Sequence, residues 1–165
     1  MDFEEILINL DFIYLRVKIN NAKIIKVNIE KKVEENYSQE YEIFIDEIKS
    51  YFFGKKEFFN LDLINFDSLT DFQKDVLIHL SKVPRGMVTT YKNLSLKLNK
   101  KNSFRAVGNA LRLNPFPIII PCHRVIKSDF TLGDYGYGSD LKKMLLIFEG
   151  VTFLDDNRVK SECVL

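Results

Sequence analysis

The sequence predicts an α+β protein with an N-terminal domain over residues 1–66, a C-terminal domain over 67–151 and a tail over 152–165. Two observations predict this class. Apolar and polar residues alternate with a period of two within the first 30 residues, as in antiparallel strands, whereas later segments repeat their apolar residues at helical spacing. Apolar residues make up 46% of the 165 residues, which is enough to bury a core.

A small antiparallel sheet is predicted at the start of the chain. "FIYLRVKI" (12–19) and "KIIKVNIE" (23–30) are expected to pair as a hairpin, because the Asn-Asn-Ala stretch at 20–22 suits a turn. "EEILINL" (4–10) is a candidate third strand. The sequence therefore predicts two or three strands before the first helix.

One helix is predicted over residues 38–54. Its apolar residues recur at helical spacing, namely Tyr41, Phe44, Ile48 and Phe52. Ser38 is expected to cap its start and Gly54 to end it. The mixed stretch that follows places the domain boundary near residues 60–68.

The C-terminal domain is predicted to be mostly helical. The segment 70–83 opens with a capping box, Thr70 to Gln73, and is expected to bury one apolar stripe, Phe72, Val76, Leu77 and Leu80. His79 lies off that stripe and is interpreted as an ordinary surface or partly packed residue. "PRG" (84–86) ends the helix, and "MVTTY" (87–91) is a short extended segment.

Two short helices follow across a polar turn. "KNLSLKL" (92–98) and "SFRAVGNALRL" (103–113) flank "NKKN" (99–102), a pattern typical of a helix-turn-helix. Asn102 or Ser103 is expected to cap the second helix, and Pro115 to stop it.

That second helix has two predicted faces. One is expected to face the core, with Phe104, Val107 and Leu111; the other is small and basic, with Arg105, Gly108, Asn109 and Arg112 flanked by Ala106 and Ala110. Small residues let a helix approach a partner closely, so this face favours sequence-indifferent contact with DNA over base readout. The alternative is a face that packs on another helix.

Charge is distributed unevenly along the chain. Residues 1–66 carry 9 Lys/Arg and 13 Asp/Glu, a net charge of −4, whereas 67–165 carry 15 and 10, a net charge of +5. The 53 residues between Asp75 and Asp129 hold ten basic residues and no carboxylate. Such a segment indicates a polyanionic partner, although a basic face paired with the acidic half is an alternative.

Several classes of protein are disfavoured. No apolar run approaches the roughly 20 residues of a membrane-spanning helix, and the acidic start is unlike a secretory signal peptide. Two cysteines 41 positions apart do not form a disulfide framework, so a reducing, cytoplasmic location is expected. The two His and two Cys lack zinc-ligand spacing, and no metal site is expected.

The stretch "FPIIIPCHRVIKS" (116–128) places one Cys and one His side by side. Cys122 and His123 follow Pro121 and the apolar, β-branched run 118–120, which is interpreted as a strand. The chain has only two Cys and two His, so one of each side by side marks this stretch as a candidate functional segment.

"RAVGNALRLNPFPIIIPCHRVI" (105–126) resembles the signature of the methylated-DNA–protein-cysteine methyltransferase family, the O6-alkylguanine-DNA alkyltransferases. The similarity extends from about Phe72 through "LLIFEG" (145–150); the first half is similar more loosely, mainly through "YFFG" (51–54). The resemblance implies an RNase H-like N-terminal domain and a winged-helix-like C-terminal domain. It also implies an intracellular DNA repair protein that needs no cofactor and acts as a monomer on double-stranded DNA.

The resemblance implies irreversible, single-turnover alkyl transfer from O6 of guanine, possibly also O4 of thymine, to Cys122. His123 matches the base, which works through a bound water, and Glu149 the carboxylate that orients it. Tyr91 matches the proton donor to the departing guanine. Arg124 is interpreted as tying the cysteine segment to the scaffold.

The remaining matches concern DNA. Arg105 matches the residue that replaces a base flipped out through the minor groove, and the small basic helix face, Ala106, Gly108, Asn109 and Arg112, matches the DNA-binding surface. Asn114 matches a hinge residue. The residues that match the substrate pocket are Pro121, Tyr135, Gly136, Tyr137 and Gly138. Cys163 has no counterpart and is interpreted as incidental.

Two departures and two alternatives accompany the resemblance. The N-terminal zinc ligands of some members are missing, and Tyr137 replaces a glycine found in other members, which should narrow the pocket. A damage-binding protein without transfer activity is one alternative, which Cys122 disfavours. A cysteine hydrolase using Cys122, His123 and Glu149 is the other, and it leaves Arg105 and the basic segment unexplained.

Overall fold

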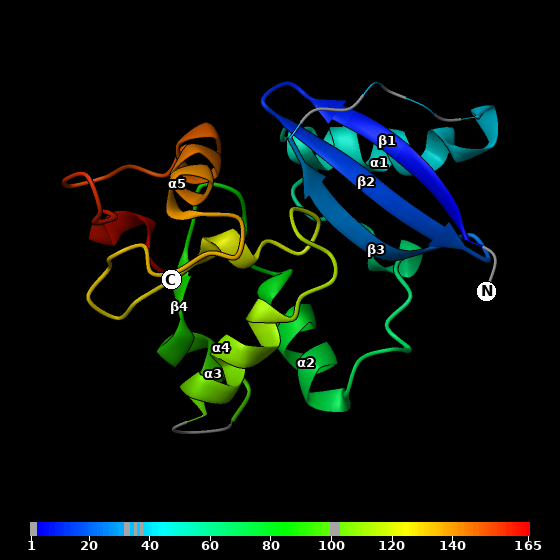
Figure 1. Ribbon diagram of the computed structural model, residues 1–165. Coiled ribbons are helices and arrows are strands. Elements are labelled where there is room, and N and C mark those ends of the chain that lie inside the picture. Colours follow the sequence, from blue (N-terminus) through cyan, green and yellow to red (C-terminus); the bar gives the residue numbers. More distant parts are fainter. Residues whose placement is uncertain (1–2, 32–33, 35, 37, 100–102) are drawn as a thin grey trace. The chain divides into compact units, whose positions relative to one another are not determined.

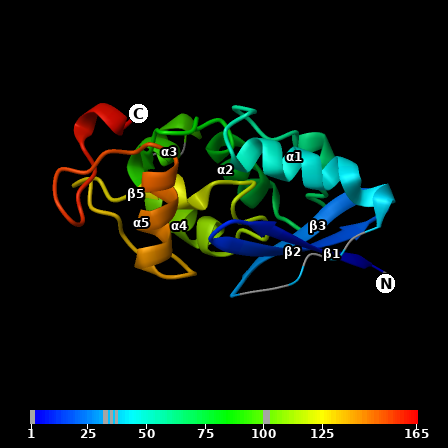
Figure 2. The same ribbon diagram turned by 90° about the horizontal axis from the view of Figure 1, so that it is seen from above.

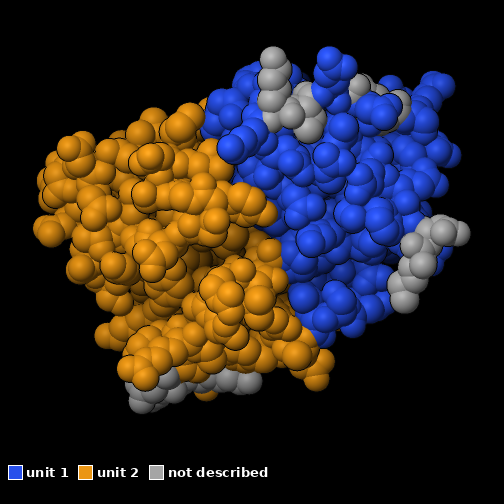
Figure 3. Space-filling view, viewed as in Figure 1, with its two compact units in different colours: residues 1–69, 115–119 blue, residues 70–114, 120–165 orange. Residues whose placement is uncertain are grey.

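The computed structural model describes residues 3–31, 34, 36, 38–99 and 103–165. Two compact units are present (Figures 1 and 3): unit 1 comprises residues 1–69 and 115–119, and unit 2 comprises 70–114 and 120–165. The chain therefore leaves unit 2 after α4, adds five residues to unit 1, and returns. No helix among the described residues combines the length and hydropathy needed to cross a membrane.

Unit 1 contains a three-stranded antiparallel sheet in the order β1 (Glu4–Leu10), β2 (Ile13–Asn20) and β3 (Lys23–Glu30). The predicted hairpin and the third strand are confirmed. Asn21 and Ala22, the two residues of the β2–β3 turn, have φ of 48° and 54°. This conformation matches the twist of a two-residue hairpin, and the alternating side chains of β2 turn Leu15 and Val17 into the core.

Helix α1 (Glu42–Phe52) covers one face of that sheet (Figures 1 and 2). It follows a short 3-10 helix, η1 (Gln39–Tyr41), and a second one, η2 (Leu61–Leu63), lies beyond it. The predicted apolar stripe is buried at Phe44, Ile48 and Phe52. The expected cap is wrong: the Ser38 hydroxyl donates to the Glu40 carboxylate and caps no backbone N–H.

Unit 2 begins with α2 (Asp71–Leu80), whose predicted capping box is present, since the Thr70 and Gln73 side chains each accept from the other's backbone N–H. Strand β4 (Thr89–Thr90) leads into α3 (Tyr91–Lys97), and α4 (Phe104–Arg112) packs on both α2 and α3. The predicted turn between α3 and α4, with the candidate cap Asn102, lies largely outside the described residues.

The predicted core face of α4 is partly wrong. Val107 and Leu111 are buried, but Phe104 is 45% exposed, because it opens the helix where the end is accessible to solvent. Ala110, expected to flank the exposed face, is buried.

The segment 152–165 is not a separate tail. It follows α5 (Ser139–Phe148), contains the 3-10 helix η4 (Ser161–Cys163), and contributes Val159 and Cys163 to a core with Val88, Ile126, Leu132, Leu146 and Val151. The backbone N–H of Val88 donates to the Cys163 carbonyl. Cys163 is thus a core residue of unit 2.

The apolar run 118–120 does not form the expected strand. Its residues are buried, yet they lie in turns and bends, and Ile118 has φ of 73°. A positive φ is rare for a β-branched residue because of its steric cost. A strand also needs paired backbone groups, and the flanking prolines Pro117 and Pro121 have no N–H to donate.

Candidate functional site

Cys122 opens a single 3-10 turn, η3 (Cys122–Arg124), that leads into β5 (Val125–Ile126). Strand β5 pairs in parallel with β4, which fixes this turn beside the start of α3. The Cys122 N–H donates to the Ile120 carbonyl (2.9 Å), and the Asn114 side-chain amide donates to the same carbonyl (3.0 Å). Cys122 stays partly accessible while His123 is only 1% exposed.

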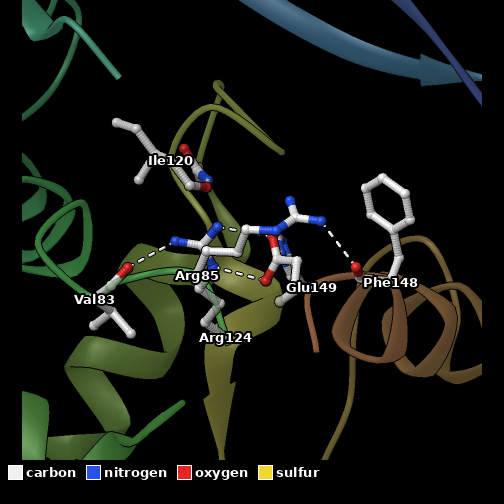
Figure 4. A network of polar contacts seen from close by, with 8 residues as sticks. Val83, Arg85, Ile120, Arg124, Phe148 and Glu149 are labelled. Atoms are coloured by element: carbon white, nitrogen blue, oxygen red, sulfur yellow. Dashed lines mark hydrogen bonds and ion pairs between the residues drawn. The ribbon is translucent and has the colours of Figure 1, made fainter. Parts of the chain in front are cut away.

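Glu149, at the end of α5, contacts both residues that follow Cys122, and Figure 4 shows its contact with Arg124. Arg124 donates from Nε to Oε2 (2.8 Å) and from Nη2 to Oε1 (2.7 Å) of this carboxylate, and from Nη1 to the Val83 carbonyl (2.7 Å). His123 Nε2 lies 3.0 Å from Glu149 Oε1. The interpretation of Arg124 as a scaffold contact agrees with these bonds.

The carboxylate of Glu149 determines which nitrogen of His123 carries the proton. Burial alone would raise the pKa of Glu149, but His123 and Arg124 hold that pKa well below its usual range. An ionised carboxylate only accepts hydrogen bonds, so Nε2 is the protonated nitrogen of the neutral ring. Nδ1 then has a free lone pair, and none of the described residues forms a hydrogen bond with it.

His123 is prepared to act as a base. Burial lowers the pKa of His123 below its usual value, and Glu149 opposes this only in part. The ring is therefore neutral near pH 7 and able to accept a proton at Nδ1. The imidazolium that forms would lie beside the Glu149 carboxylate.

Burial raises the pKa of the Cys122 thiol, so the thiolate does not form without help. The Asn114 amide and the positive charge of Lys142 oppose this shift. Lys142 is fully buried in α5, and its ammonium donates to the carbonyls of Val125 (2.7 Å) and Leu132 (2.5 Å). Burial lowers its pKa to about 8.

Lys142 was missed from the sequence, because a lysine in an amphipathic helix is normally exposed. Only its place two turns before Glu149 on α5 could have drawn attention to it. Arg85 was also missed; it donates to the Phe148 carbonyl (2.8 Å) and lies over the Phe148 ring, next to Glu149 (Figure 4).

Two tyrosines of the loop 134–138 place aromatic rings next to His123. The Tyr135 ring meets the His123 ring edge to face, with centroids 6.4 Å apart, and Tyr137 packs against Tyr135 at 5.7 Å. Burial and the nearby Cys122 charge raise the pKa of Tyr135, so its hydroxyl stays protonated. Tyr137 is 41% exposed, and Gly136 and Gly138 have open space around them.

Tyr91, the first residue of α3, belongs to the same site. Burial raises its pKa, and negative charges at Asp134 and Cys122 raise it further, so its phenol remains a proton donor near neutral pH. Its ring lies under Gly108 of α4, where an added Cβ would meet it at 3.8 Å. The site and α4 are thereby joined.

The outer face of α4 carries the predicted basic residues. Arg105, Ala106, Asn109 and Arg112 are exposed, and Arg112 donates to the Asn109 side chain (3.0 Å). Arg105 and Arg112 lie two turns apart on one face of α4, which leaves it small and positively charged. Among the described residues, no cluster of three or more His, Cys, Asp or Glu side chains could hold a metal ion.

The site therefore joins a nucleophile, a base and a carboxylate in one unit with a basic helix face. Such an arrangement can deprotonate a thiol for attack on an electrophile. The Cys122 and His123 pair, Glu149, Tyr91 and the loop 134–138 all belong to unit 2, as do Arg105 and Asn114.

Residues 71–151 match the family described as "6-O-methylguanine DNA methyltransferase, DNA binding domain". A methylated-DNA–protein-cysteine methyltransferase of Thermococcus sibiricus is 40% identical over 128 residues, 77% of this chain and 67% of that protein. One of Methanosarcina barkeri is 46% identical over 103 residues, 62% of this chain. The chain spans only 64% of the Methanosarcina relative, slightly less than two thirds.

A solved structure is similar over most of the chain. Mycobacterium tuberculosis OGT in complex with DNA shares 26% identity, with a TM-score of 0.74 over 87% of this chain and 91% of the other. The mixed architecture, a small antiparallel sheet with several helices, agrees with this neighbour.

Proposed function

This chain belongs to the methylated-DNA–protein-cysteine methyltransferase family, and from that premise we propose that it repairs DNA by transferring an alkyl group from O6 of guanine to its own Cys122. The observation that carries the proposal is the contact of His123 with Glu149 immediately after a partly accessible Cys122. The family's finer fold features are part of the proposal: unit 1 as an RNase H-like domain and unit 2 as a winged-helix-like domain.

The reaction begins with a proton transfer. His123 Nδ1 takes the thiol proton of Cys122 through a bridging water, and the imidazolium is stabilised by Glu149, 3.0 Å from Nε2. The new thiolate is stabilised by the Asn114 amide and the charge of Lys142. Each charge that forms therefore lies near an opposite charge or a hydrogen-bond donor.

The alkyl transfer then breaks one bond and forms another. The thiolate sulfur bonds to the alkyl carbon, the bond from that carbon to O6 breaks, and its electron pair remains on guanine. Tyr91 gives a proton to the departing guanine and recovers a proton from the solvent or from the imidazolium of His123. In the net reaction, guanine thus gains the proton that the thiol lost. The thioether is stable, which limits each chain to one turnover.

DNA binding is assigned to the exposed face of α4. A guanine stacked inside a duplex cannot bring its O6 substituent to the Cys122 sulfur within the fold, so the base must leave the stack. Arg105 is exposed on α4 and is proposed to fill the vacated space from the minor groove. Ala106, Gly108, Asn109 and Arg112 let the helix approach closely. Asn114 is proposed as the hinge between α4 and the Cys122 segment, and Pro121 and the loop 134–138 as the surroundings of the flipped base.

The proposal includes action as a monomer and a cytoplasmic location with access to DNA. The test is the stoichiometry of transfer. Incubation with a duplex carrying labelled O6-methylguanine should give one label per chain, located on Cys122 by peptide mass spectrometry.

Cys163→Ala is the matched control, because Cys163 is the other cysteine and is a buried core residue. This variant should keep full transfer, whereas Cys122→Ala should bind the duplex and accept no label. Continued turnover beyond one equivalent would support a hydrolase, and binding without label in the wild type would support a damage-binding protein.

A further inference from the structure

The turn that follows α2 lies against the end of α5 in unit 2, and the reaction described above gives it no role. The Met87 N–H donates to the Pro84 carbonyl (3.2 Å), which closes a β-turn with Arg85 and Gly86 in the middle. Gly86 has φ of 79°, and a Cβ added there would meet the Glu149 carbonyl oxygen at 3.3 Å. Glycine therefore permits both the backbone conformation and the close approach to Glu149.

Arg85 makes two contacts with the last residue of α5. Its Nη2 donates to the Phe148 carbonyl (2.8 Å), and its guanidinium carbon lies 4.7 Å from the centroid of the Phe148 ring (Figure 4). The last carbonyls of a helix have no partner within it, and a positive charge at this end complements the helix dipole. Arg85 therefore anchors the C-terminal end of α5.

The backbone closes the end of α5 by two other hydrogen bonds. The Gly150 N–H donates to the Ile147 carbonyl (3.0 Å) and the Val151 N–H to the Leu146 carbonyl (2.9 Å), which is the pattern of a Schellman motif. This motif does not use the Phe148 carbonyl. The guanidinium thus supplies a separate contact, from a different segment of unit 2.

Glu149 is the residue directly after the anchored carbonyl. Its carboxylate lies 3.0 Å from His123 Nε2 and accepts from Arg124, which also donates to the Val83 carbonyl just before the turn. Two arginines therefore hold Glu149 in different ways. Arg124 holds the carboxylate itself, whereas Arg85 holds the backbone from which the side chain extends.

We propose that Arg85 is a positioning residue for Glu149: by anchoring the end of α5, it keeps the carboxylate within hydrogen-bond distance of His123. The proposal rests on the proposed function, because this position matters to transfer only if His123 acts as the base for Cys122. A displacement of roughly 1 Å in a catalytic group can slow a reaction by about 100-fold, so loss of the anchor should be visible in the transfer rate.

The experiment separates transfer from DNA binding. Single-turnover transfer is measured at saturating O6-methylguanine duplex, and affinity is measured by titration with an unmodified duplex, for the wild type, Arg85→Met and Arg85→Lys. Circular dichroism at the assay temperature checks that each variant is folded.

Lys143→Met is the matched control. Lys143 is a half-buried cation like Arg85, lies over the Phe153 ring (5.7 Å) and contacts Asp156 (3.4 Å), but it belongs to the middle of α5. Its loss therefore removes the same kinds of contact without releasing the end of the helix.

Arg85→Met should slow transfer at saturation by up to about 100-fold and leave the affinity for the duplex unchanged. Arg85→Lys should recover most of the loss, because an ammonium keeps the charge and can donate to the Phe148 carbonyl. Lys143→Met should transfer at the wild-type rate.

The decisive variant combines Arg85→Met with Glu149→Gln. Residues that act through one contact have non-additive effects. Because Arg85 is proposed to act through Glu149, Arg85→Met should cost much less in the Glu149→Gln background than in the wild type.

An unchanged transfer rate in Arg85→Met, an equal loss in both backgrounds, or an equal loss in Lys143→Met would overturn the proposal while methyl transfer by the wild type stands. A loss confined to duplex affinity would also overturn it, since Arg85 would then be a DNA contact. Absence of methyl transfer in the wild type would instead overturn the proposed function and this inference with it.

Discussion

Arg124 and Glu149 form a buried two-point ion pair, with Nε and Nη2 of the guanidinium 2.8 and 2.7 Å from the two carboxylate oxygens. The pair connects the turn that holds Cys122 to the end of α5. Because the Val83 carbonyl accepts from Nη1 as well, one side chain fastens three segments of unit 2. The same carboxylate contacts His123, so Glu149 takes part both in the ion pair that supports the site and in the proposed proton transfer.

Arg124→Met should destabilise the protein strongly. The methionine fills part of the space, but Glu149 is left as a buried carboxylate without its main partner, which typically costs about 3–5 kcal/mol. Urea unfolding followed by circular dichroism measures the loss. Arg124→Lys keeps the charge but not the planar two-point contact, and should lose less. Equal stability of Arg124→Met and wild type would show that the pair does not hold this site together.

Glu149→Gln should slow methyl transfer by up to roughly 100- to 10,000-fold, the range that general acid–base assistance contributes. The glutamine can still accept a hydrogen bond from His123, yet it no longer stabilises the imidazolium. Rapid-quench transfer kinetics and a duplex-binding titration separate the two effects. Binding should stay within about 2-fold; a variant that binds poorly but transfers normally once saturated would remove the catalytic role.

Lys142 should make stability depend on pH in the alkaline range. Burial lowers its pKa from 10.5 to about 8, so between these pH values the unfolded chain binds more protons than the folded chain. The free energy of unfolding contributed by Lys142 therefore rises as pH rises from 8 to 10.5, by at most about 3 kcal/mol.

The measurement is the difference in unfolding free energy between wild type and Lys142→Met at several pH values. Taking the difference cancels the groups that Lys142 does not influence. The Cys122 thiol is influenced by Lys142, and its raised pKa acts in the opposite direction, so both proteins are measured in a Cys122→Ala background. The wild type should gain on the variant between pH 8 and 10.5. A constant difference would mean that Lys142 titrates normally.

Arg105→Ala should impair repair in duplex DNA far more than reaction with free O6-methylguanine. Only the duplex requires a base to leave the stack, and Arg105 is exposed on α4 for contact with it. Arg112→Ala, on the same face, is the control for simple loss of a positive charge. Equal losses of Arg105→Ala on duplex and free base would argue against base flipping by this residue.

The structural features that the sequence predicted correctly are those encoded by residues close together in the chain. The strand alternation of β2 and β3 and the Thr70–Gln73 capping box are encoded by residues close in the chain, and the structure confirms them. The expected strand at 118–120 failed for the opposite reason. A β-branched run indicates burial as readily as strand pairing, and here the run is buried in turns.

The chemistry of the site was only partly visible. Adjacent Cys122 and His123 drew attention to this stretch, and the resemblance supplied their roles as nucleophile and base and pointed to Glu149. The buried Lys142 could not be found in this way, because its burial depends on the carbonyls of Val125 and Leu132, which the fold brings to it. Long-range hydrogen bonds of this kind leave no periodic pattern in a sequence.

Tyr137 should decide which adducts the loop 134–138 accepts. It stands where some family members have glycine, packs on Tyr135 and is 41% exposed. A methyl adduct needs little room beyond the base, but a benzyl ring must pack against this loop. We expect slow reaction with O6-benzylguanine and ordinary repair of O6-methylguanine.

Tyr137→Gly should therefore raise the benzyl rate by roughly 5- to 150-fold, because crowding a packed site costs about 1–3 kcal/mol, and change the methyl rate only a few-fold. Second-order rates for both substrates, in wild type and variant, give the answer. Tyr137→Phe is the control, since it keeps the ring and should keep the wild-type ratio. If Tyr137 points toward DNA or solvent instead, both rates change together and the benzyl-to-methyl ratio stays fixed, which would remove the pocket-narrowing role.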